Sequence, residues 1–244
     1  MRGTLLKRAE PASRDGVKGA TFMTETLRRG AMRLRHRIVA AIDATDADRA
    51  RSVAKALAGH VDALKVNWPL VLAAGPGIVT EFATSAYVLC DFKIADIPNT
   101  NRLIVEQAVA RGASGVICHA FAGEDSVRAC VEAAKAAEVF VVTEMSHPGG
   151  QEFTAKHAEE FARLAVRAGA AGIIAPATRP ERVRILRGVV GDRLILSPGV
   201  GAQGGNPADA IRAGADAVIV GRALYEAEDP AKAAAAIARE IETR

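Results

Sequence analysis

Charged residues cluster in an unusual place in the stretch DFKIADIPNT, residues 91–100. The apolar run YVLC, residues 87–90, leads directly into this stretch, which carries Asp91, Lys93 and Asp96. Buried charges are costly unless they are paired, so a strand interior rarely contains two carboxylates and an ammonium so close together. Because residues two apart on a strand face the same side, Asp91 and Lys93 predict an ion pair on one face of a strand end.

Other polar side chains also occur at the ends of apolar runs. Asp43 follows the first run, Lys65 lies in the second, and His119 lies near the end of the fourth. Asp43 and Lys65 alternate in sign with the Asp91–Lys93 pair along three consecutive runs, and mutual pairing would offset the cost of burying them. The structural alternative is an ion-pair network that only fixes strand register. Four charges at the ends of three adjacent strands favour a functional site.

A second cluster is typical of anion binding. The loop SPGVGAQGG, residues 197–205, contains four glycines that let backbone N–H groups approach an anion, and NPAD then starts a helix. Arg222 follows the eighth apolar run, where its guanidinium can hold a phosphate through two hydrogen bonds. Together they predict a phosphate site, with a plain glycine turn as the alternative. Gln203 can reach either the phosphate or the rest of a ligand.

Histidine and cysteine spacing does not indicate a metal site. His147 lies in the polar stretch TEMSHPGGQEF, residues 143–153, and its neighbours Pro148 and Gly149 favour a turn residue over a general base. The other histidines have no metal-ligand spacing. The cysteines have no Cys-x-x-Cys spacing and lie in apolar surroundings, so we interpret them as reduced core thiols of a cytoplasmic protein. These cysteines are Cys90, Cys118 and Cys130.

The elements that must position these groups follow a repeated pattern. Short runs rich in Val, Ile and Leu, typical of strands buried on both faces, alternate with amphipathic stretches that often end at glycine. The expected strands are 37–42, 61–66, 87–92, 115–120, 139–144, 171–176, 193–198 and 216–221. The expected helices are 46–59, 100–112, 124–137, 156–169, 179–190 and 229–242.

This alternation predicts an α/β fold, a single (β/α)8 TIM barrel, which typically has about 250 residues. A doubly wound open sheet is the alternative, but the first strand lacks the Gly-x-Gly-x-x-Gly turn that such a sheet often carries. In a barrel, the carboxyl ends of the strands bring the charged cluster and the phosphate loop to one face.

The charge of the chain is concentrated near its beginning. Residues 1–32 hold 7 Lys/Arg and 3 Asp/Glu (7 − 3 = +4), so the remaining 25 basic and 25 acidic residues balance. The sequence therefore predicts a basic N-terminal extension over 1–36 and a barrel over 37–244, with no nucleic-acid partner. We interpret the extension as dispensable; the alternatives are a transit-like segment, a regulatory arm, or an over-long start with Met23 or Met32 as the initiator. No apolar stretch is long enough to predict a secretory signal or a membrane-spanning helix.

Five motifs in order resemble orotidine 5′-phosphate decarboxylase of the compact microbial and archaeal type. They are DFKIADIPNTN, TEMSHPG, TRPER, SPGVGAQGG and VIVGRALY, and the resemblance runs from about Arg37 to the C-terminus. It implies a homodimeric lyase of pyrimidine (UMP) biosynthesis that converts orotidine 5′-monophosphate (OMP) to uridine 5′-monophosphate (UMP) without metal or cofactor.

The resemblance also implies roles for individual residues. Lys93 would protonate C6 of the pyrimidine, Asp91 would lie beside the substrate carboxylate, and Asp96 would come from the other subunit. The implied substrate-binding residues are Asp43, Lys65, Ile97, Thr100, Ser146, Pro198, Gly199, Val200, Gly201, Gln203, Gly204, Gly221 and Arg222. Ile97 and Thr100 would also act across the interface, and Lys65 would hold the charged array. Asn67, Trp68, Ala120 and Ala122 depart from the residues common in the family.

Two other functions compete with this one. Sugar-phosphate enzymes such as hexulose-phosphate synthase share the barrel and the Asp-x-Lys-x-x-Asp motif, but they bind magnesium and carry an acid near the position of Lys65. A non-enzymatic nucleotide sensor would keep the phosphate site and lose the charged cluster. The intact charged cluster and Lys65 favour the cofactor-free decarboxylase.

Overall fold

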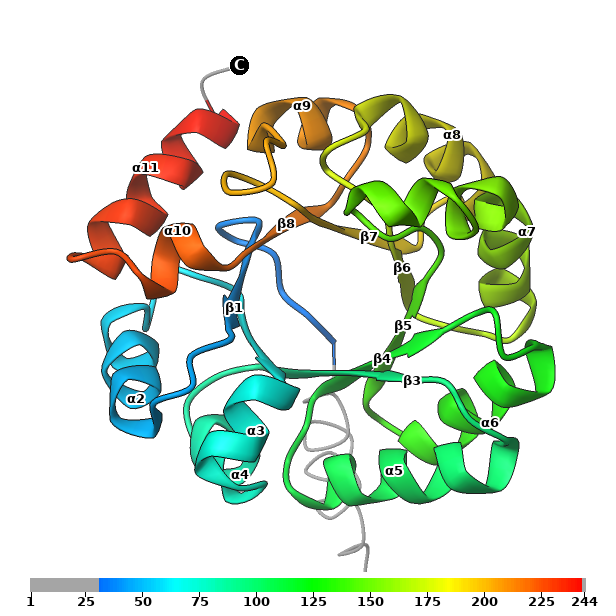
Figure 1. The fold of residues 1–244 in the computed structure, drawn as a ribbon, viewed down its shortest axis with the longest axis horizontal. Helices are drawn as coiled ribbons and strands as arrows, with labels where there is room; N and C mark the ends of the chain where they lie inside the picture. Colours follow the sequence, from blue (N-terminus) through cyan, green and yellow to red (C-terminus); the bar gives the residue numbers. More distant parts are fainter. Residues whose placement is uncertain (1–30, 243–244) are drawn as a thin grey trace, which may run out of the picture.

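A computed structural model describes residues 31–242 as a barrel of parallel strands inside a ring of helices (Figure 1). Each strand pairs with its sequence neighbour, and β1 also pairs with β8, which closes the sheet. The predicted (β/α)8 barrel is therefore confirmed. The strands are β1 (Ile38–Ile42), β2 (Ala63–Asn67), β3 (Val88–Ile94), β4 (Gly115–His119), β5 (Glu138–Val142), β6 (Gly172–Ile174), β7 (Leu194–Pro198) and β8 (Ala217–Val220).

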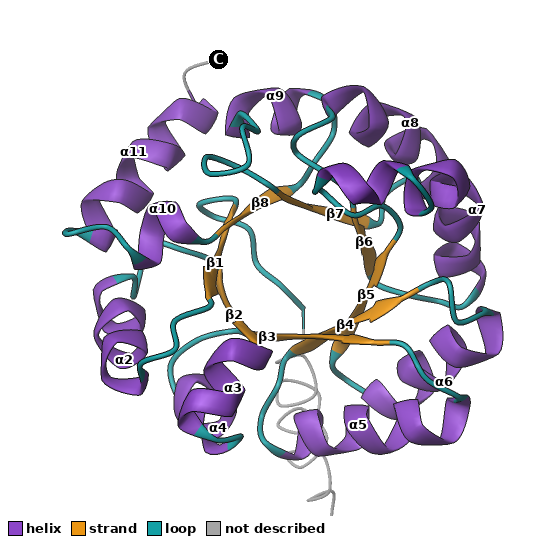
Figure 2. Cartoon of the chain, in the orientation of Figure 1, coloured by secondary structure: helices purple, strands orange, loops and turns teal. Residues whose placement is uncertain are grey.

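Two hydrophobic layers explain why the strands have no polar face. The side chains of alternate residues, such as Val39, Leu89 and Phe140, fill the inside of the barrel. Their neighbours, such as Ile38 and Val88, pack outward against the helices. Figure 2 shows this arrangement, with the strands enclosed by helices. Every strand is buried on both sides, so near-continuous apolar runs are what such a barrel requires.

Helices cover the outside of the barrel in chain order. Six of them agree with the predicted helices to within a few residues: α2 (Ala47–Ala56), α5 (Pro98–Ala110), α6 (Glu124–Ala134), α7 (Thr154–Arg167), α8 (Pro180–Val190) and α11 (Pro230–Glu242). Shorter elements complete the ring: α3 (Trp68–Ala74), α4 (Gly77–Ala83), η1 (Pro148–Gln151), α9 (Pro207–Arg212) and α10 (Arg222–Tyr225).

The pair α3 and α4 was not predicted from the sequence. Gly75, with φ of 76°, ends α3, and Pro76 directly precedes α4, so each helix spans only seven residues. Two turns are too short to show a clear amphipathic period. Asn67 at the end of β2 accepts a hydrogen bond from the Trp68 N–H, and α3 therefore starts at once on leaving the strand.

Residues 31–37 close the amino-terminal end of the barrel. Met32 is buried among the inward-facing side chains, and its N–H donates to the Glu138 carboxylate at the start of β5. The N–H groups of Arg35 and His36 donate to Asp62, which precedes β2. The predicted extension thus includes a described part that contacts the barrel, while residues 1–30 lie outside the described residues.

The three cysteines are buried and form no disulfide with one another, as predicted for core thiols. Within residues 31–242, none of the helices combines the length and apolar character needed to cross a membrane.

Candidate active site

Four charged side chains form a chain of ion pairs where β1, β2 and β3 end. Lys65 Nζ lies 2.8 Å from Asp91 Oδ2 and 3.5 Å from Asp43 Oδ1. Lys93 Nζ lies 2.8 Å from Asp91 Oδ1. The side chains of Lys65 and Asp91 are each only 6% exposed, whereas that of Lys93 is 34% exposed. The predicted alternation of charge around one rim is therefore present, with Asp91 shared by two ammonium groups.

Mutual pairing keeps the buried members of this array charged. Burial raises the pKa of Asp91, but the two neighbouring lysines outweigh burial and hold the pKa below its usual range. Burial likewise lowers the pKa of Lys65, but Asp91 and Asp43 outweigh it and raise the pKa above the ordinary value. The carboxylate and the ammonium are therefore both ionised near neutral pH.

Lys93 has a backbone conformation that is rare for a residue with a side chain. Its φ is 46°, in the left-handed region, which costs roughly 1–2 kcal/mol for residues other than glycine. The pairing of β3 with β4 shifts register between Cys90 and Ile94, so a bulge lies at this point. Bulges redirect side chains at the rims of barrels. The bulge lets Lys93 reach Asp91, two residues earlier, at the mouth of the barrel.

His119 lies at the end of β4, close to this array. Its ring packs against Phe121 at a centroid distance of 4.8 Å, and its buried Nδ1 has no hydrogen-bond partner among the described residues. Burial and the nearby Lys93 charge lower the pKa of His119 to about 4, against a smaller opposing effect of Asp91. His119 is therefore neutral at physiological pH and supplies no charge to the site.

A cavity of about 280 Å³ opens at the carboxyl ends of the strands. Its charged wall contains Asp43, Lys65, Asp91 and Lys93. The opposite wall is built from the glycine-rich loop after β7 and from Arg222. Apolar side chains on the inside of the barrel line the rest: Ala41, Ile117, Val142, Ile174 and Ile219. The cavity thus has a charged end and an end formed by the glycine-rich loop and Arg222, and an apolar surface joins the two ends.

The glycine-rich loop has a backbone conformation that depends on its glycines. Gly199, Gly201 and Gly204 have φ values of 104°, 71° and 88°, which side-chain-bearing residues rarely adopt. A Cβ added at Gly199 would come within 2.9 Å of Thr178 Cγ2. The predicted residues Pro198, Gly199, Val200, Gln203, Gly221 and Arg222 line the cavity, whereas Gly201 and Gly204 lie in the loop away from it.

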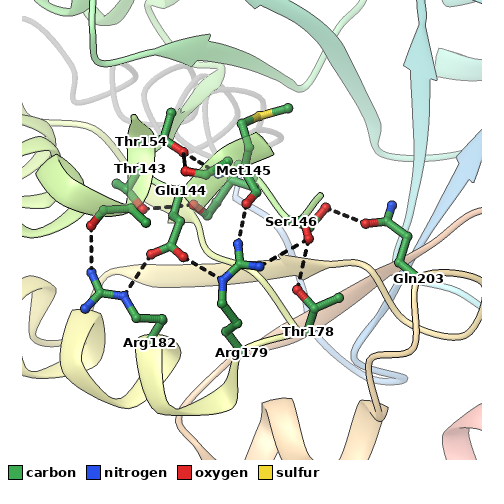
Figure 3. Close-up of polar contacts among 12 residues, drawn as sticks. Thr143, Glu144, Met145, Ser146, Thr154, Thr178, Arg179, Arg182 and Gln203 are labelled. Carbon is green, nitrogen blue, oxygen red and sulfur yellow. Dashed lines mark hydrogen bonds and ion pairs between the residues drawn. The ribbon is translucent and has the colours of Figure 1, made fainter. Parts of the chain in front are cut away.

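Ser146 and Gln203 connect two loops across the cavity mouth. Ser146 Oγ donates to Gln203 Oε1 at 2.8 Å, and both residues line the cavity (Figure 3). The residues had been predicted to contact different parts of a ligand, and the contact between them was not predicted. The loop after β5 and the loop after β7 therefore form a bridge over the site.

A buried acid two residues after the end of β5 supports this bridge from below. Glu144 is fully buried, and its two oxygens lie 2.8 Å from Arg179 Nε and 2.9 Å from Arg182 Nε. Arg179 also donates to the Met145 carbonyl at 2.5 Å. Figure 3 shows the two arginines side by side beneath Glu144, with Thr178 donating to the Ser146 carbonyl. The start of α8 thus fixes the backbone on both sides of the cavity loop.

The third charge of the opening motif does not line this cavity. Asp96 is exposed, and neither it nor Ile97 lines the cavity, while Thr100 lines a separate apolar groove. Asn101 Oδ1 accepts from the Asp96 N–H, and Ser126 Oγ donates to the Asp96 carbonyl. Because Asn101 and Ser126 are buried, they hold the Asp96 backbone in a fixed position on the rim.

Sequence reasoning missed several residues that line the cavity. Asn67 and Tyr225 both line it, and neither was predicted. Asn67 lies two residues after Lys65 on the same strand, and Tyr225 lies three residues after Arg222 on one helical turn, so periodicity contained the signal. The pairing of Glu144 with Arg179 and Arg182 had no such signal because it joins separate elements.

Comparison with known proteins gives a consistent result. The chain is 55% identical over 208 residues to the orotidine 5′-phosphate decarboxylase of Methanosarcina mazei. The alignment covers 84% of this chain and 94% of that protein. The fold superposes on orotidine 5′-monophosphate decarboxylase from Methanocaldococcus jannaschii complexed with inhibitor BMP, with a TM-score of 0.80, 38% identity and coverage of 84% and 97%.

A structure of the Pyrococcus horikoshii OT3 enzyme of the same name gives a TM-score of 0.78 at 44% identity, with coverage of 84% and 99%. The profile of the orotidine 5′-phosphate decarboxylase / HUMPS family matches residues 36–237, which is nearly all of the barrel. The chain therefore belongs to the orotidine 5′-phosphate decarboxylase / HUMPS family.

Proposed function

We propose that this chain decarboxylates OMP to UMP, with Lys93 as the proton donor. The observation that carries the proposal is the Lys65–Asp91–Lys93 chain of ion pairs, which faces the same cavity as Arg222 and the glycine-rich loop. A nucleoside monophosphate has a phosphate for one end of this cavity and a ring for the other. Two relatives that are 55% and 52% identical to this chain carry the same activity in their names.

The chemistry explains why a charged array would be placed there. When the bond between C6 and the carboxylate breaks, carbon dioxide leaves and the electron pair remains on C6. A proton from the Lys93 ammonium then completes the C6–H bond of UMP. Lys93 and Lys65 are already held by Asp91 before any ligand arrives, so the positive charge needs little reorganisation in the transition state.

The anion-binding end would supply binding energy at a distance from the reacting atom. Arg222 and Gln203 are both exposed at the cavity mouth, and a bound phosphate and ring would cover them. Such remote contacts can be used to close a loop and to orient the ring. Ser146 would contact the pyrimidine while keeping its bridge to Gln203.

A homodimer would complete the site. Asp96 lies on the rim outside its own cavity, next to exposed apolar side chains that include Ile97 and Leu103. An exposed apolar surface of this kind is typical of an interface. In a symmetric dimer, Asp96 of each subunit would lie beside Lys93 of the other subunit, with Ile97 and Thr100 shaping the same site.

Turnover of OMP by the purified chain, followed by ultraviolet absorbance, tests the function. We expect wild-type turnover and its loss in Lys93→Ala, with a matched Lys55→Ala variant on the exposed face of α2 behaving as wild type. Absence of wild-type turnover by folded protein would overturn the function. Near-normal kcat in Lys93→Ala would overturn only the role of Lys93.

Excess chelator tests the metal-dependent alternative within the family. A divalent cation would have to bind beside the Lys65 ammonium, where like charges repel, and metals of this class prefer oxygen ligands. We therefore expect full turnover in the presence of chelator. Loss of activity that returns with added magnesium would favour the sugar-phosphate chemistry.

Mixed dimers test the shared site. Asp96→Ala and Lys93→Ala each damage a different half of the proposed composite site, so a dimer with one copy of each keeps one intact site. We expect the mixture to regain activity that neither variant has alone. Verified mixed dimers without any recovered activity would contradict the sharing of Asp96.

A further inference from the structure

Trp68 is the first residue of α3, and its indole reaches the strand that carries Lys93. The indole Nε1–H donates to the Phe92 carbonyl at 3.1 Å, and the indole ring stacks on the Phe92 ring at a centroid distance of 4.7 Å. The pairing of β2 with β3 ends at Asn67 and Asp91, directly before this contact. The Trp68 side chain therefore continues the contacts of β2 with β3 by one more residue.

The position of that carbonyl determines how Lys93 is presented. The Phe92 carbonyl belongs to the peptide group that precedes Lys93, and rotation of this group changes φ of Lys93. That φ is 46°, a strained value at the bulge between Cys90 and Ile94. Strained backbone persists only where the surroundings hold it in place. A hydrogen bond to the Phe92 carbonyl is a restraint of this kind.

A second contact holds the backbone of Trp68 in place. Asn67 Oδ1 accepts from the backbone N–H of Trp68 at 2.7 Å, which fixes the start of α3 relative to the end of β2. Asn67 also lines the cavity beside Lys65 and Asp91. Two adjacent residues thus connect the end of β2, the start of α3 and the bulge of β3.

We propose that Trp68 is a positioning residue for Lys93, acting through the hydrogen bond from its indole to the Phe92 carbonyl. This inference rests on the proposed role of Lys93 as proton donor. Loss of the bond lets the peptide group before Lys93 rotate, and the ammonium then spends less time in the orientation set by Asp91. The chemical step slows, while the phosphate end of the cavity is unchanged.

The test uses two replacements that keep an aromatic ring but remove the donor. Trp68→Phe retains stacking, and benzothienylalanine at position 68 retains the full indole shape with sulfur in place of N–H. The chain has a single Trp, so its indole resonance is unambiguous in a ¹⁵N-labelled sample. A slowly exchanging indole N–H in the wild type would report the hydrogen bond directly.

We expect both variants to lower the single-turnover rate on OMP about tenfold, the effect of one lost hydrogen bond of ordinary strength. We expect UMP affinity to stay within about twofold of wild type, because the phosphate contacts are intact. Leu72→Ala, which removes a largely exposed apolar side chain from the same helix α3, should keep the wild-type rate. Sedimentation should give the same assembly state for all three.

Unchanged single-turnover rates in both position-68 variants, with active wild type and inactive Lys93→Ala, would overturn this inference alone. Equal weakening of UMP binding and of the rate would also overturn it, since general damage to the fold has that effect. Failure of the wild type to turn over OMP would instead contradict the proposed function, so the two failures are distinguishable.

Discussion

At the scale of single residues, the site depends on one carboxylate that serves two ammonium groups. Asp91 accepts from both Lys65 and Lys93, so each lysine has a fixed partner without any ligand. The sequence predicted this cluster because Asp91 and Lys93 interrupt an apolar run at strand spacing. It did not predict the positive φ of Lys93, since a bulge arises from the register between two strands.

Arg222→Ala should separate binding from chemistry. Arg222 lines the cavity at the start of α10, far along the chain from Lys93, and offers a charged hydrogen bond to phosphate. Its loss should raise KM for OMP roughly 10–100-fold, with a smaller change in kcat. Steady-state kinetics measure both values, and Arg128→Ala, on exposed α6, is the control. An unchanged KM would argue against the phosphate site.

His119 should make the fold sensitive to mild acid. The unfolded chain protonates this histidine near pH 6.5, whereas the folded chain does so only near pH 4, because the pKa of His119 is lowered to about 4. The unfolded state therefore binds more protons between these values, and the free energy of unfolding decreases as pH falls, by at most about 3 kcal/mol.

His119→Asn should remove this part of the acid sensitivity. Denaturant titrations at pH 7 and pH 4.5 would measure it as the difference between wild type and variant. The pKa of Asp91 is lowered, so the stabilising effect of this carboxylate is lost only at pH values below the ordinary pKa of a carboxyl group. Asp91 therefore does not contribute to the change in stability between pH 7 and pH 4.5. Equal losses of stability in the two proteins would contradict the role of His119.

At the scale of elements, the loops at the carboxyl ends are held by contacts that join distant parts of the chain. Glu144, just after β5, binds two arginines near the start of α8, and one of them also binds the Met145 carbonyl. Strands and long helices were predictable from apolar runs and amphipathic periods. The helices α3 and α4 were not predictable, because helices of this length are too short to show an amphipathic period. The Glu144 contacts were not predictable either, because residues that meet only in the folded structure have no characteristic spacing in the sequence.

Glu144→Gln should destabilise the protein more than an ordinary charge change. The amide keeps the size of the side chain but leaves the partly buried guanidinium groups of Arg179 and Arg182 without their shared negative partner. We expect the free energy of unfolding to fall by about 2–4 kcal/mol. Glu106→Gln, whose exposed partner is Arg102, should change it by less than about 0.5 kcal/mol.

Urea denaturation would compare the two variants. Similar midpoints for Glu144→Gln and Glu106→Gln would show that the arginines find equivalent partners without the carboxylate. Because Arg179 also holds the loop of Ser146, the variant should in addition raise KM for OMP.

At the scale of the whole molecule, the two ends of the barrel have different tasks. The carboxyl ends of the strands carry the cavity, and the amino ends are closed by residues 31–37. The barrel itself was predictable because eight apolar runs alternate with helices in a chain of suitable length. The closure by Met32 was not predictable, since a single methionine in a basic segment gives no pattern.

Two truncations should locate the true start of the folded unit. A chain that begins at residue 31 keeps the Met32 contacts and should match the full chain in thermal midpoint and OMP turnover. A chain that begins at residue 37 loses buried Met32 and the hydrogen bonds to Asp62 and Glu138. Its free energy of unfolding should fall by about 2–4 kcal/mol. Equal stability of the two truncated chains would mean that residues 31–36 are dispensable for folding.

The position of residue 31 at the amino-terminal end of the barrel has a practical consequence for immobilising the protein or fusing it to a partner. The described chain enters the barrel at the end opposite the cavity, and the C-terminal helix α11 ends on the outer ring (Figure 1). A tether, a fusion partner or a solid support joined at residue 31 would therefore leave the cavity mouth open to the surrounding solution. Immobilised protein should keep the substrate affinity of the free enzyme, whereas coupling through the loop at Gln203 should block access.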